Sequence, residues 1–360
     1  MPGEQQAARR AALAVQLDRE GLGALLVTHP PNVRYLSGFT GSAGFLLVTT
    51  QHATLVTDFR YATQAPDEAP GVDVQVERVN LWDRLGRLLA QAPVDTLGIE
   101  GAVLTVRDAE RVGGLTRARI TPAPELVERL RASKSPEEVA TIRAAADLAH
   151  EALAEILPGV RAGRREIDIA SELEAALRRR GSEWHPFPTI VASGPRAALP
   201  HARSSEREVR SGEFVLIDFG AQVDGYCSDI TRTVAVGRAD DRQRTIYSLV
   251  AEAQLRARTH VRAGLPGRDA DALARDVIAA RGFGDAFGHS LGHGIGLEVH
   301  EAPRLARTAE GVLAEGAVVT IEPGVYRPGW GGVRIEDDVV LGADGPEILT
   351  QFPRELIELG

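Results

Sequence analysis

The 360-residue sequence contains almost no lysine and almost no cysteine. Lys134 is its only lysine and Cys227 its only cysteine, although the chain has 41 basic residues. One cysteine cannot form an intramolecular disulfide. The scarcity of lysine also excludes a Schiff-base lysine or a phosphate-loop lysine in the core, so those classes of chemistry are set aside.

We expect neither a signal peptide nor a membrane span, because the sequence shows no signal-peptide pattern and no apolar run of spanning length. Its 44% hydrophobic and 25% charged residues are typical of a soluble globular protein, and its length allows two domains with separate cores. A net charge of -9 provides no electrostatic attraction to nucleic acid or to an anionic membrane. Together with the lack of disulfides, these features predict a protein of the reducing cytoplasm.

The pattern of predicted elements changes near residue 131. Before it, a helix pattern from Gln5 to Glu20, a helical segment at Leu81–Ala90 and short apolar runs predict a small α/β domain. Pro122 and Pro124 interrupt this pattern, and Ser133-Lys-Ser-Pro-Glu-Glu138 has the features of a helix start. We therefore predict domains at residues 1–131 and 132–360. The apolar runs of the first are Ala24–Thr28, Gly44–Thr49, Ala53–Thr57, Val72–Val76 and Thr96–Glu100.

After residue 132, helices rich in alanine and arginine alternate with pairs of strand-like segments, which predicts an α+β domain. The expected helices are Pro136–Ile156, Arg164–Arg180, Asp240–Val261 and Arg268–Arg281.

Asp218 and Asp229 lie in two strand-like segments separated by the hairpin signal Val223-Asp224-Gly225. A two-residue loop at Val223-Asp224 places the two aspartates directly opposite each other, whereas a loop at Asp224-Gly225 makes them diagonal neighbours. Either register brings two carboxylates roughly 5–8 Å apart on one face. This arrangement is unfavourable unless a cation lies between them, so the pair predicts a divalent metal site.

Further metal-binding residue types follow in the sequence. His293 lies in Gly288-His-Ser-Leu-Gly-His-Gly-Ile-Gly296, Glu322 in Val319-Thr-Ile-Glu-Pro-Gly324 and Glu336 in Val333-Arg-Ile-Glu-Asp-Asp338. The Gly/Pro-rich stretch 323–332 allows Glu322 and Glu336 to converge on paired strands. Four carboxylates and one imidazole exceed the needs of one hard cation and suit two metals about 3.5–4 Å apart. Cys227 is interpreted as a small hydrophobe, since an oxygen-rich site prefers harder donors.

The series Asp218, Asp229, His293, Glu322 and Glu336 resembles the ligand set of the pita-bread metallopeptidases, which include methionine aminopeptidase, aminopeptidase P, prolidase and the metal-free creatinase. Leu199-Pro-His-Ala-Arg203 and Val299-His-Glu301 resemble the proline-specific branch. The region before Ala132, with Asn32-Val-Arg-Tyr-Leu-Ser-Gly38, resembles the amino-terminal domain of prolidases and aminopeptidases P. The resemblance implies a pita-bread catalytic domain, with helices on one face of a curved antiparallel sheet, behind a creatinase-like domain.

The resemblance also implies a dinuclear metallopeptidase that cleaves the bond before proline, most simply an Xaa-Pro dipeptidase. Asp218 would bind one metal, His293 and Glu322 the other, and Asp229 and Glu336 both. Glu322 would also transfer a proton, and His201 and His300 would contact the scissile carbonyl. The ligand set suits Mn, with Co, Zn or Fe open. A homodimer is implied, in which the first domain of one subunit caps the site of its neighbour.

Three further residues are candidates for the substrate pocket. The glycines around His289 and His293 argue against a helix, so we expect His293 to point inward and His289 to line the pocket. Arg334 shares a face with Glu336 on a regular strand and serves either as a structural partner of a carboxylate or as a ligand of the substrate carboxylate. Tyr326 is expected to line the same pocket. Gly38-Phe-Thr-Gly-Ser-Ala-Gly44 lacks the Lys-Ser/Thr ending of a phosphate loop and predicts a tight loop.

Two other classes of function remain open from the sequence. One is a different peptidase, namely aminopeptidase P acting on longer peptides, while methionine aminopeptidase is disfavoured by the extra first domain. The other is a non-enzymatic pita-bread module that binds peptides. Such modules lack the complete ligand set, whereas all five residues are present in this chain.

Overall fold

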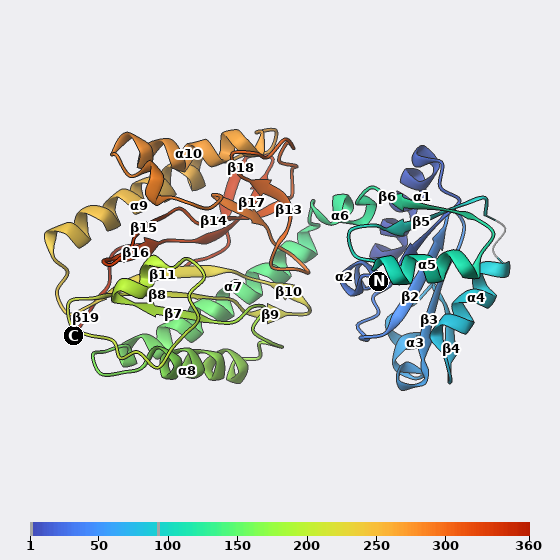
Figure 1. Cartoon of the computed structure of the whole chain (residues 1–360), viewed down its shortest axis with the longest axis horizontal. Coiled ribbons are helices and arrows are strands. Elements are labelled where there is room, and N and C mark those ends of the chain that lie inside the picture. Colours follow the sequence, from blue (N-terminus) through green and yellow to red (C-terminus); the bar gives the residue numbers. More distant parts are fainter. Residues whose placement is uncertain (1–2, 92–93) are drawn as a thin grey trace. The chain divides into compact units, whose positions relative to one another are not determined.

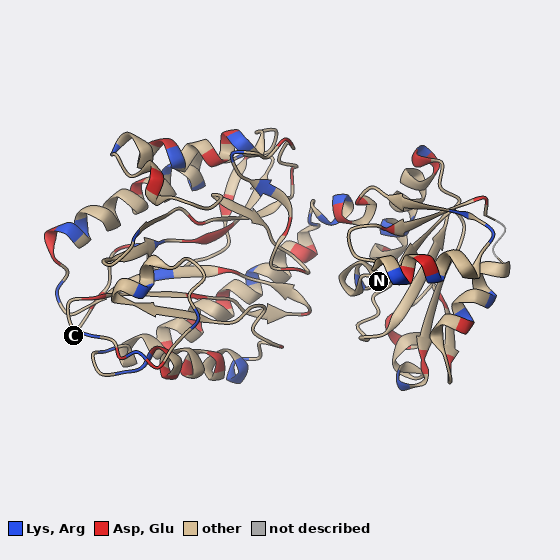
Figure 2. Ribbon diagram, viewed as in Figure 1, with Lys and Arg blue, Asp and Glu red and all other residues tan. Residues whose placement is uncertain are grey.

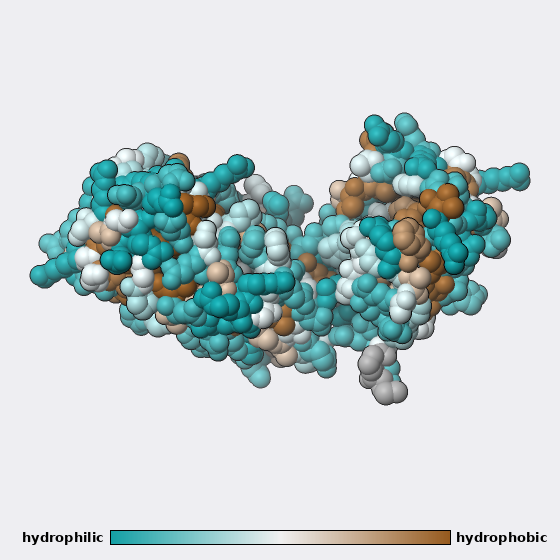
Figure 3. Space-filling view, turned by 90° about the horizontal axis from the view of Figure 1, so that it is seen from below, coloured by the Kyte–Doolittle hydropathy of each residue, from teal (hydrophilic) through white to brown (hydrophobic). Residues whose placement is uncertain are grey.

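The computed structural model describes residues 3–91 and 94–360. Its contacts divide the chain into two compact units, Met1–Arg131 and Ala132–Gly360 (Figure 1). Acidic and basic residues are interspersed along the helices of both units (Figure 2). In the view of Figure 3 hydrophilic residues make up most of the surface, and apolar residues gather in separate patches. Within the described ranges, no helix combines the length and apolar character needed to cross a bilayer.

The first unit is built on one six-stranded mixed sheet with strand order β4-β3-β2-β1-β5-β6. Its parallel pairs are β3 with β4, β1 with β5 and β5 with β6, which is the α/β arrangement that the sequence predicts. The strands are β1 (Ala24–Val27), β2 (Gly44–Thr49), β3 (Ala53–Asp58), β4 (Asp73–Glu77), β5 (Thr96–Glu100) and β6 (Arg119–Ala123). The α-helices are α1 (Glu4–Glu20), α2 (Pro30–Ser37), α3 (Gln64–Glu68), α4 (Leu81–Gln91), α5 (Val106–Leu115) and α6 (Leu126–Arg131).

The sequence does not predict α2, α3, α5, α6 and β6 of this unit, and α2 is the one next to the predicted tight loop. It is short, runs from Pro30 to Ser37 and is capped by Gly38, whose φ of 89° belongs to the left-handed region. A Cβ at Gly38 would lie 2.4 Å from the carbonyl oxygen of Glu68. The predicted tight loop from Gly38 to Gly44 therefore begins as the cap of a helix, and it leads into β2 as expected.

The second unit contains long helices and antiparallel strands. The α-helices are α7 (Pro136–Ile156), α8 (Glu166–Arg179), α9 (Asp241–His260) and α10 (Gly267–Ala280). The strands are β7 (Ile190–Ser193), β8 (Phe214–Phe219), β9 (Gln222–Val223), β10 (Tyr226–Cys227), β11 (Ile230–Val236), β12 (Gly292–Gly294), β13 (Glu301–Leu305), β14 (Val318–Ile321), β15 (Gly324–Arg327), β16 (Gly331–Arg334), β17 (Asp337–Gly342), β18 (Gly345–Ile348) and β19 (Glu358–Leu359).

The strands of the second unit run antiparallel to their neighbours, except that β19 is parallel to β11. They form a four-stranded sheet, β19-β11-β8-β7, a five-stranded sheet, β13-β12-β14-β17-β18, and the two-stranded pairs β9–β10 and β15–β16. Glu322 and Pro323 separate β14 from β15, and proline has no N–H to continue a ladder. The register between β12 and β13 also shifts at His293 and Gly294. The ladders are thus interrupted next to the predicted ligands.

Side-chain alternation on β8 and β11 directs one face of these strands to helices α7 and α8. Val215, Ile217 and Phe219 of β8 join the core formed with these helices, as do Ile230 and Val234 of β11. Because successive side chains of a strand point to opposite faces, Asp218 and Thr231 face away from that core. The helices therefore cover the apolar face, and the polar face is directed to the site.

Arg232 anchors β11 to the C-terminal part of the second unit. Its side chain is 2% exposed and forms an ion pair of 2.8 Å with Asp337, which is fully buried. It also donates to the main-chain oxygens of Glu336, Phe352 and Pro353. Asp337 also pairs with Arg354 and accepts from Gln254, so it would keep two partners without Arg232. Removal of Arg232 is nevertheless costly, because three main-chain oxygens and a buried carboxylate each lose a donor in a dry environment.

We expect Arg232→Met to lower the free energy of unfolding by about 3 kcal/mol or more. The matched control is Arg244→Met, which removes the exposed pair with Glu358 and should change stability by less than about 1 kcal/mol. Urea unfolding of both variants measures the difference. Equal losses in the two variants would contradict the structural role given to Arg232.

Candidate metal centre

The hairpin register places Asp218 and Asp229 as diagonal neighbours. Asp218 of β8 pairs with Thr231 of β11. Asp229 lies two residues before Thr231, so the alternation of side chains gives the two residues the same face. The turn contains Asp224 and Gly225, with φ values of 45° and 70°, as a two-residue hairpin loop with left-handed residues requires. The structure therefore has the second of the two registers that the sequence allows.

Glu322 and Glu336 lie beyond the same end of the β15–β16 pair. Gly324 pairs with Arg334. Glu322 lies two residues before Gly324, and Glu336 lies two residues after Arg334. Thr231 donates a 2.5 Å hydrogen bond to Glu336, which ties this end to β11. The predicted convergence of the two glutamates on paired strands is thus present.

His293 lies on the short strand β12, which passes very close to its neighbours. A Cβ on Gly292 would lie 1.9 Å from the carbonyl oxygen of Thr320, and one on Gly294 would lie 2.2 Å from that of Ala302. Only glycine allows these approaches, and the segment is a strand rather than a helix, as the glycines indicate. The bulge between His293 and Gly294 accompanies this tight packing.

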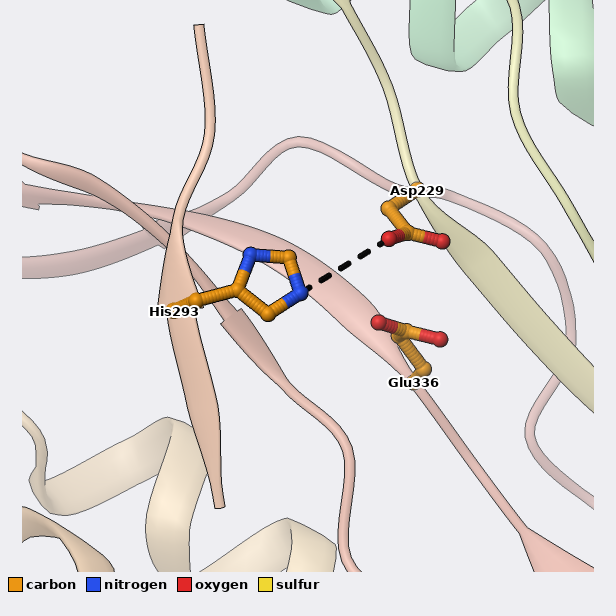
Figure 4. A group of neighbouring side chains, drawn as sticks. All are labelled: Asp229, His293 and Glu336. Atoms are coloured by element: carbon orange, nitrogen blue, oxygen red, sulfur yellow. Dashed lines mark ion pairs between the residues drawn. The ribbon is translucent and has the colours of Figure 1, made fainter. Parts of the chain in front are cut away.

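Asp229, His293 and Glu336 point toward one another from three different segments (Figure 4). One ligand atom from each lies within 4.8 Å of the others. The Nε2 atom of His293 is 3.9 Å from a carboxylate oxygen of Asp229 and 3.4 Å from one of Glu322. The arrangement offers oxygen and imidazole donors around one point, which suits a divalent cation.

The carboxylates of this cluster lie close together, and the nearby positive charge is too small to offset their mutual repulsion. Burial, followed by the charges of neighbouring carboxylates, raises the pKa of Asp229 and of Glu336 well above the ordinary values. Burial also raises the pKa of Glu322 to about 8, against the lowering influence of Arg334. Burial lowers the pKa of His293 to about 4, so that its imidazole is neutral at pH 7 and able to bind a metal.

Two buried oxygens indicate that a cation fits here. Among the described residues, Oδ1 of Asp218 and Oδ1 of Asp229 have no hydrogen-bond partner. A buried carboxylate oxygen without a partner is costly, and a metal ion removes that cost. The donors available are the ones that Mn, Fe, Co or Zn accept.

Arg334 connects Asp218 to Tyr326 and His289. Its buried guanidinium donates to Asp218 and to the hydroxyl of Tyr326, which in turn lies 2.8 Å from Nε2 of His289. Arg334 also donates to Thr231 at 2.9 Å. His289 is thus placed next to Tyr326 and outside the three-residue cluster, while Arg334 has a carboxylate partner within the protein.

His201 and His300 are exposed, unlike the residues of the cluster. The ring of His300 lies 4.3 Å from that of His293, measured between centroids. Partial burial of its ring, and then the charge of His201, lower the pKa of His300. Cys227 is buried among apolar side chains, and burial raises the pKa of its thiol to about 12, in keeping with its interpretation as a hydrophobe.

Three residues that orient the cluster are missing from the sequence analysis. Thr231 holds Glu336, and Thr320 donates to Glu322 at 3.2 Å and accepts from the main-chain N–H of His293 at 3.1 Å. Asp338 accepts from the main-chain N–H of Asp229 at 3.0 Å. Each of the three lies two positions from a predicted ligand, and this spacing is the available signal, since alternate residues of an extended strand share a face.

The raised carboxylate pKa values predict that metal stabilises the protein more at high pH. Without metal, the folded state retains a proton on Glu322 up to pH of about 8, whereas the unfolded chain loses it above pH of about 4, so stability falls as pH rises toward 8. The raised pKa values of Asp229 and Glu336 act in the same direction. The lowered pKa of His293 affects stability only below about pH 6.5. Between pH 6.5 and 8 the metal-free protein should therefore lose about 1.4 kcal/mol per pH unit for each retained proton.

Calorimetry of the protein with Mn and with a chelator measures this effect. The gain in Tm caused by Mn should be larger at pH 8 than at pH 6.5, and the same protein serves as its own control for titrating groups elsewhere. A gain in Tm that is independent of pH would contradict the prediction.

Comparison with known proteins agrees with this architecture. Residues 9–133 match the creatinase/prolidase N-terminal domain, and residues 140–343 match metallopeptidase family M24. A solved structure of an Xaa-Pro dipeptidase from Bacillus anthracis is 43% identical with a TM-score of 0.96, covering 98% of this chain and 100% of that one. A solved X-Pro aminopeptidase from Thermotoga maritima is 37% identical with a TM-score of 0.90, covering 97% of this chain and 99% of that one.

A protein of Pyrococcus horikoshii named Xaa-Pro dipeptidase is 37% identical over 342 residues, which are 95% of this chain and 96% of that protein. The predicted fold class is confirmed by these matches. The chain belongs to metallopeptidase family M24, with a pita-bread catalytic domain preceded by a creatinase-type α/β domain.

Proposed function

We propose that this protein is a dinuclear Xaa-Pro dipeptidase, which hydrolyses the peptide bond before a C-terminal proline. The observation that carries the proposal is the convergence of Asp229, His293 and Glu336, with Glu322 and Asp218 beside them. The names of the relatives from Bacillus anthracis and Pyrococcus horikoshii support the substrate class. The alternative is aminopeptidase P, which the relative from Thermotoga maritima favours.

Five residues would hold two divalent ions, with Mn as the first candidate. Asp218 would bind one ion, His293 and Glu322 the other, and Asp229 and Glu336 both. When bound, such ions supply Lewis acidity toward the substrate carbonyl and lower the pKa of a water molecule. The buried oxygens of Asp218 and Asp229 that have no partner among the described residues support this assignment.

The side chains around the ligands would carry the proton and position the substrate. Glu322 accepts a proton from the attacking water at its carboxylate and donates it to the leaving proline nitrogen. His201 and His300 donate hydrogen bonds to the oxygen that becomes negatively charged during attack. The proline nitrogen has no N–H in the substrate, so recognition does not depend on a hydrogen bond from that atom.

The pocket for proline would be lined by His289, Tyr326 and Arg334. His289 and Tyr326 are joined by a 2.8 Å hydrogen bond, and burial lowers the pKa of His289 to about 4, which keeps its ring uncharged. Arg334 either binds the free carboxylate of the dipeptide or holds Asp218 in place. Its ion pair with Asp218 favours the second role, and the substrate role is tested below.

We further propose a cytoplasmic homodimer, in which residues 1–131 serve in dimerisation and in capping the site of the partner subunit. The lone cysteine supports the cytoplasmic location. The loop from Gly38 to Gly44 is the segment that would cap the partner's site. If the loop closes the far side of the partner's pocket, residues after proline would be excluded, which favours dipeptides over longer chains.

Two substitutions test the proposed ligands, one at Glu322 for proton transfer together with metal binding and one at Asp229 for metal binding. Glu322→Gln should lower kcat by at least about 100-fold, because it removes both a proton carrier and a charged ligand. Asp229→Asn should lose bound metal together with activity, as measured by metal analysis after dialysis. Full metal content and normal turnover in Asp229→Asn would rule out the assignment, and metal-free wild-type protein would favour a non-enzymatic module.

Arg334→Ala distinguishes the two roles of this residue. If Arg334 binds the substrate carboxylate, KM for Ala-Pro should rise by about tenfold or more, while KM for its C-terminal amide changes little. If it positions Asp218, both substrates should lose activity equally and metal content should fall. Steady-state kinetics with the two substrates, together with metal analysis, decide between these outcomes.

Substrate length distinguishes the dipeptidase from aminopeptidase P. We expect kcat/KM for Ala-Pro to exceed that for Ala-Pro-Ala and for a longer peptide with the same first residues, all measured with added Mn. Cleavage of the longer peptides as well as or better than Ala-Pro would identify an aminopeptidase P.

A further inference from the structure

Glu166 is a fully buried glutamate at the first position of α8. One of its carboxylate oxygens accepts from the main-chain N–H and the hydroxyl of Ser193, at 2.7 and 2.8 Å. The other accepts from Nε of Arg196 at 3.0 Å and from the main-chain N–H and hydroxyl of Ser205, at 3.1 and 2.6 Å. Five donors therefore converge on a single side chain, which is a dense arrangement for a buried carboxylate.

These donors come from both ends of one segment. Ser193 ends β7, Arg196 lies in the short 3-10 helix Gly194–Ala198, and Ser205 follows the exposed stretch around His201. Arg196 also donates to the main-chain oxygen of Arg203. Glu166 thus closes the base of a loop, residues 194–204, that carries His201.

The other end of this loop lies against the candidate metal centre. Arg334, which donates to Asp218, also donates to the main-chain oxygen of Pro200 at 3.3 Å, directly before His201. The loop also packs closely on β16, since a Cβ on Gly332 would lie 2.2 Å from the carbonyl oxygen of Ala197. The loop is therefore held at its base by Glu166 and near its tip by Arg334.

We propose that Glu166 is a positioning residue that sets the place of His201 in the active site by closing the base of loop 194–204. The proposal rests on the function proposed above, in which His201 contacts the substrate. A carboxylate suits this position because it only accepts hydrogen bonds, and all five of its partners are donors. A glutamine of the same size would have to direct an NH2 group at either Ser193 or Ser205, so one end of the loop would lose its partner.

The first test is hydrogen exchange of the peptides that cover residues 193–205, measured by mass spectrometry on the full-length protein. Glu166→Gln should increase their exchange rate by at least about tenfold. The variant lacks the hydrogen bonds to Ser193 or to Ser205, so opening of the loop costs less free energy. The control is Leu173→Ala, a core change on the same helix that lowers Tm without touching the loop. Exchange of these peptides that is no faster in Glu166→Gln than in Leu173→Ala would overturn the proposal.

The second test is a double-mutant cycle with His201→Ala, using kcat for Ala-Pro. If Glu166 acts through His201, Glu166→Gln should lower kcat by about tenfold in the wild type and by less than about twofold in the His201→Ala background, with metal content unchanged. Additive losses would overturn the positioning role. If His201→Ala alone leaves kcat unchanged, the role proposed for His201 fails, and the exchange experiment still decides whether Glu166 closes the loop.

Discussion

The crowding of buried carboxylates is the constraint on which the rest of the catalytic unit depends. Asp218, Asp229 and Glu336 are each less than a tenth exposed, and Glu322 lies beside them. Arg334 is the buried cation that pairs with this group, through Asp218. Like charges brought so close in a dry environment destabilise the fold unless protons or cations compensate them. The raised pKa values describe this imbalance in the absence of metal.

The surrounding structure keeps this unfavourable group in place through neutral donors and packed backbone. Thr231 and Thr320 each hold a glutamate, and the glycines on either side of His293 let its strand approach its neighbours closely. The helices α7 and α8 cover the opposite, apolar face of β8 and β11. Burial of that face favours folding and offsets the cost of the charged face, so the apolar core and the polar site are two sides of the same strands.

The site also depends on two buried side chains that hold its segments in place. Arg232 ties β11 to the main chain at Glu336, and Glu166 joins the two ends of the loop that carries His201. Both anchors are buried and use all the hydrogen-bonding capacity that they present. Precise placement of exposed groups such as His201 requires such supports, because an exposed side chain has few packing contacts of its own.

The sequence by itself determined the long helices and most strands of the first unit, and it narrowed the register of the Asp218–Asp229 hairpin to two possibilities, because side-chain alternation and turn preferences are local properties. The helix start at Ser135 is an example, since its capping box lies within four residues. Only the tertiary structure decided which register holds, that the ladders break beside Pro323, and that Arg334 pairs with Asp218. That pair joins residues 116 positions apart, and a contact between distant segments leaves no periodic pattern in the sequence. The supporting roles of Thr231 and Glu166 also depend on contacts between distant segments, so only the folded structure shows them.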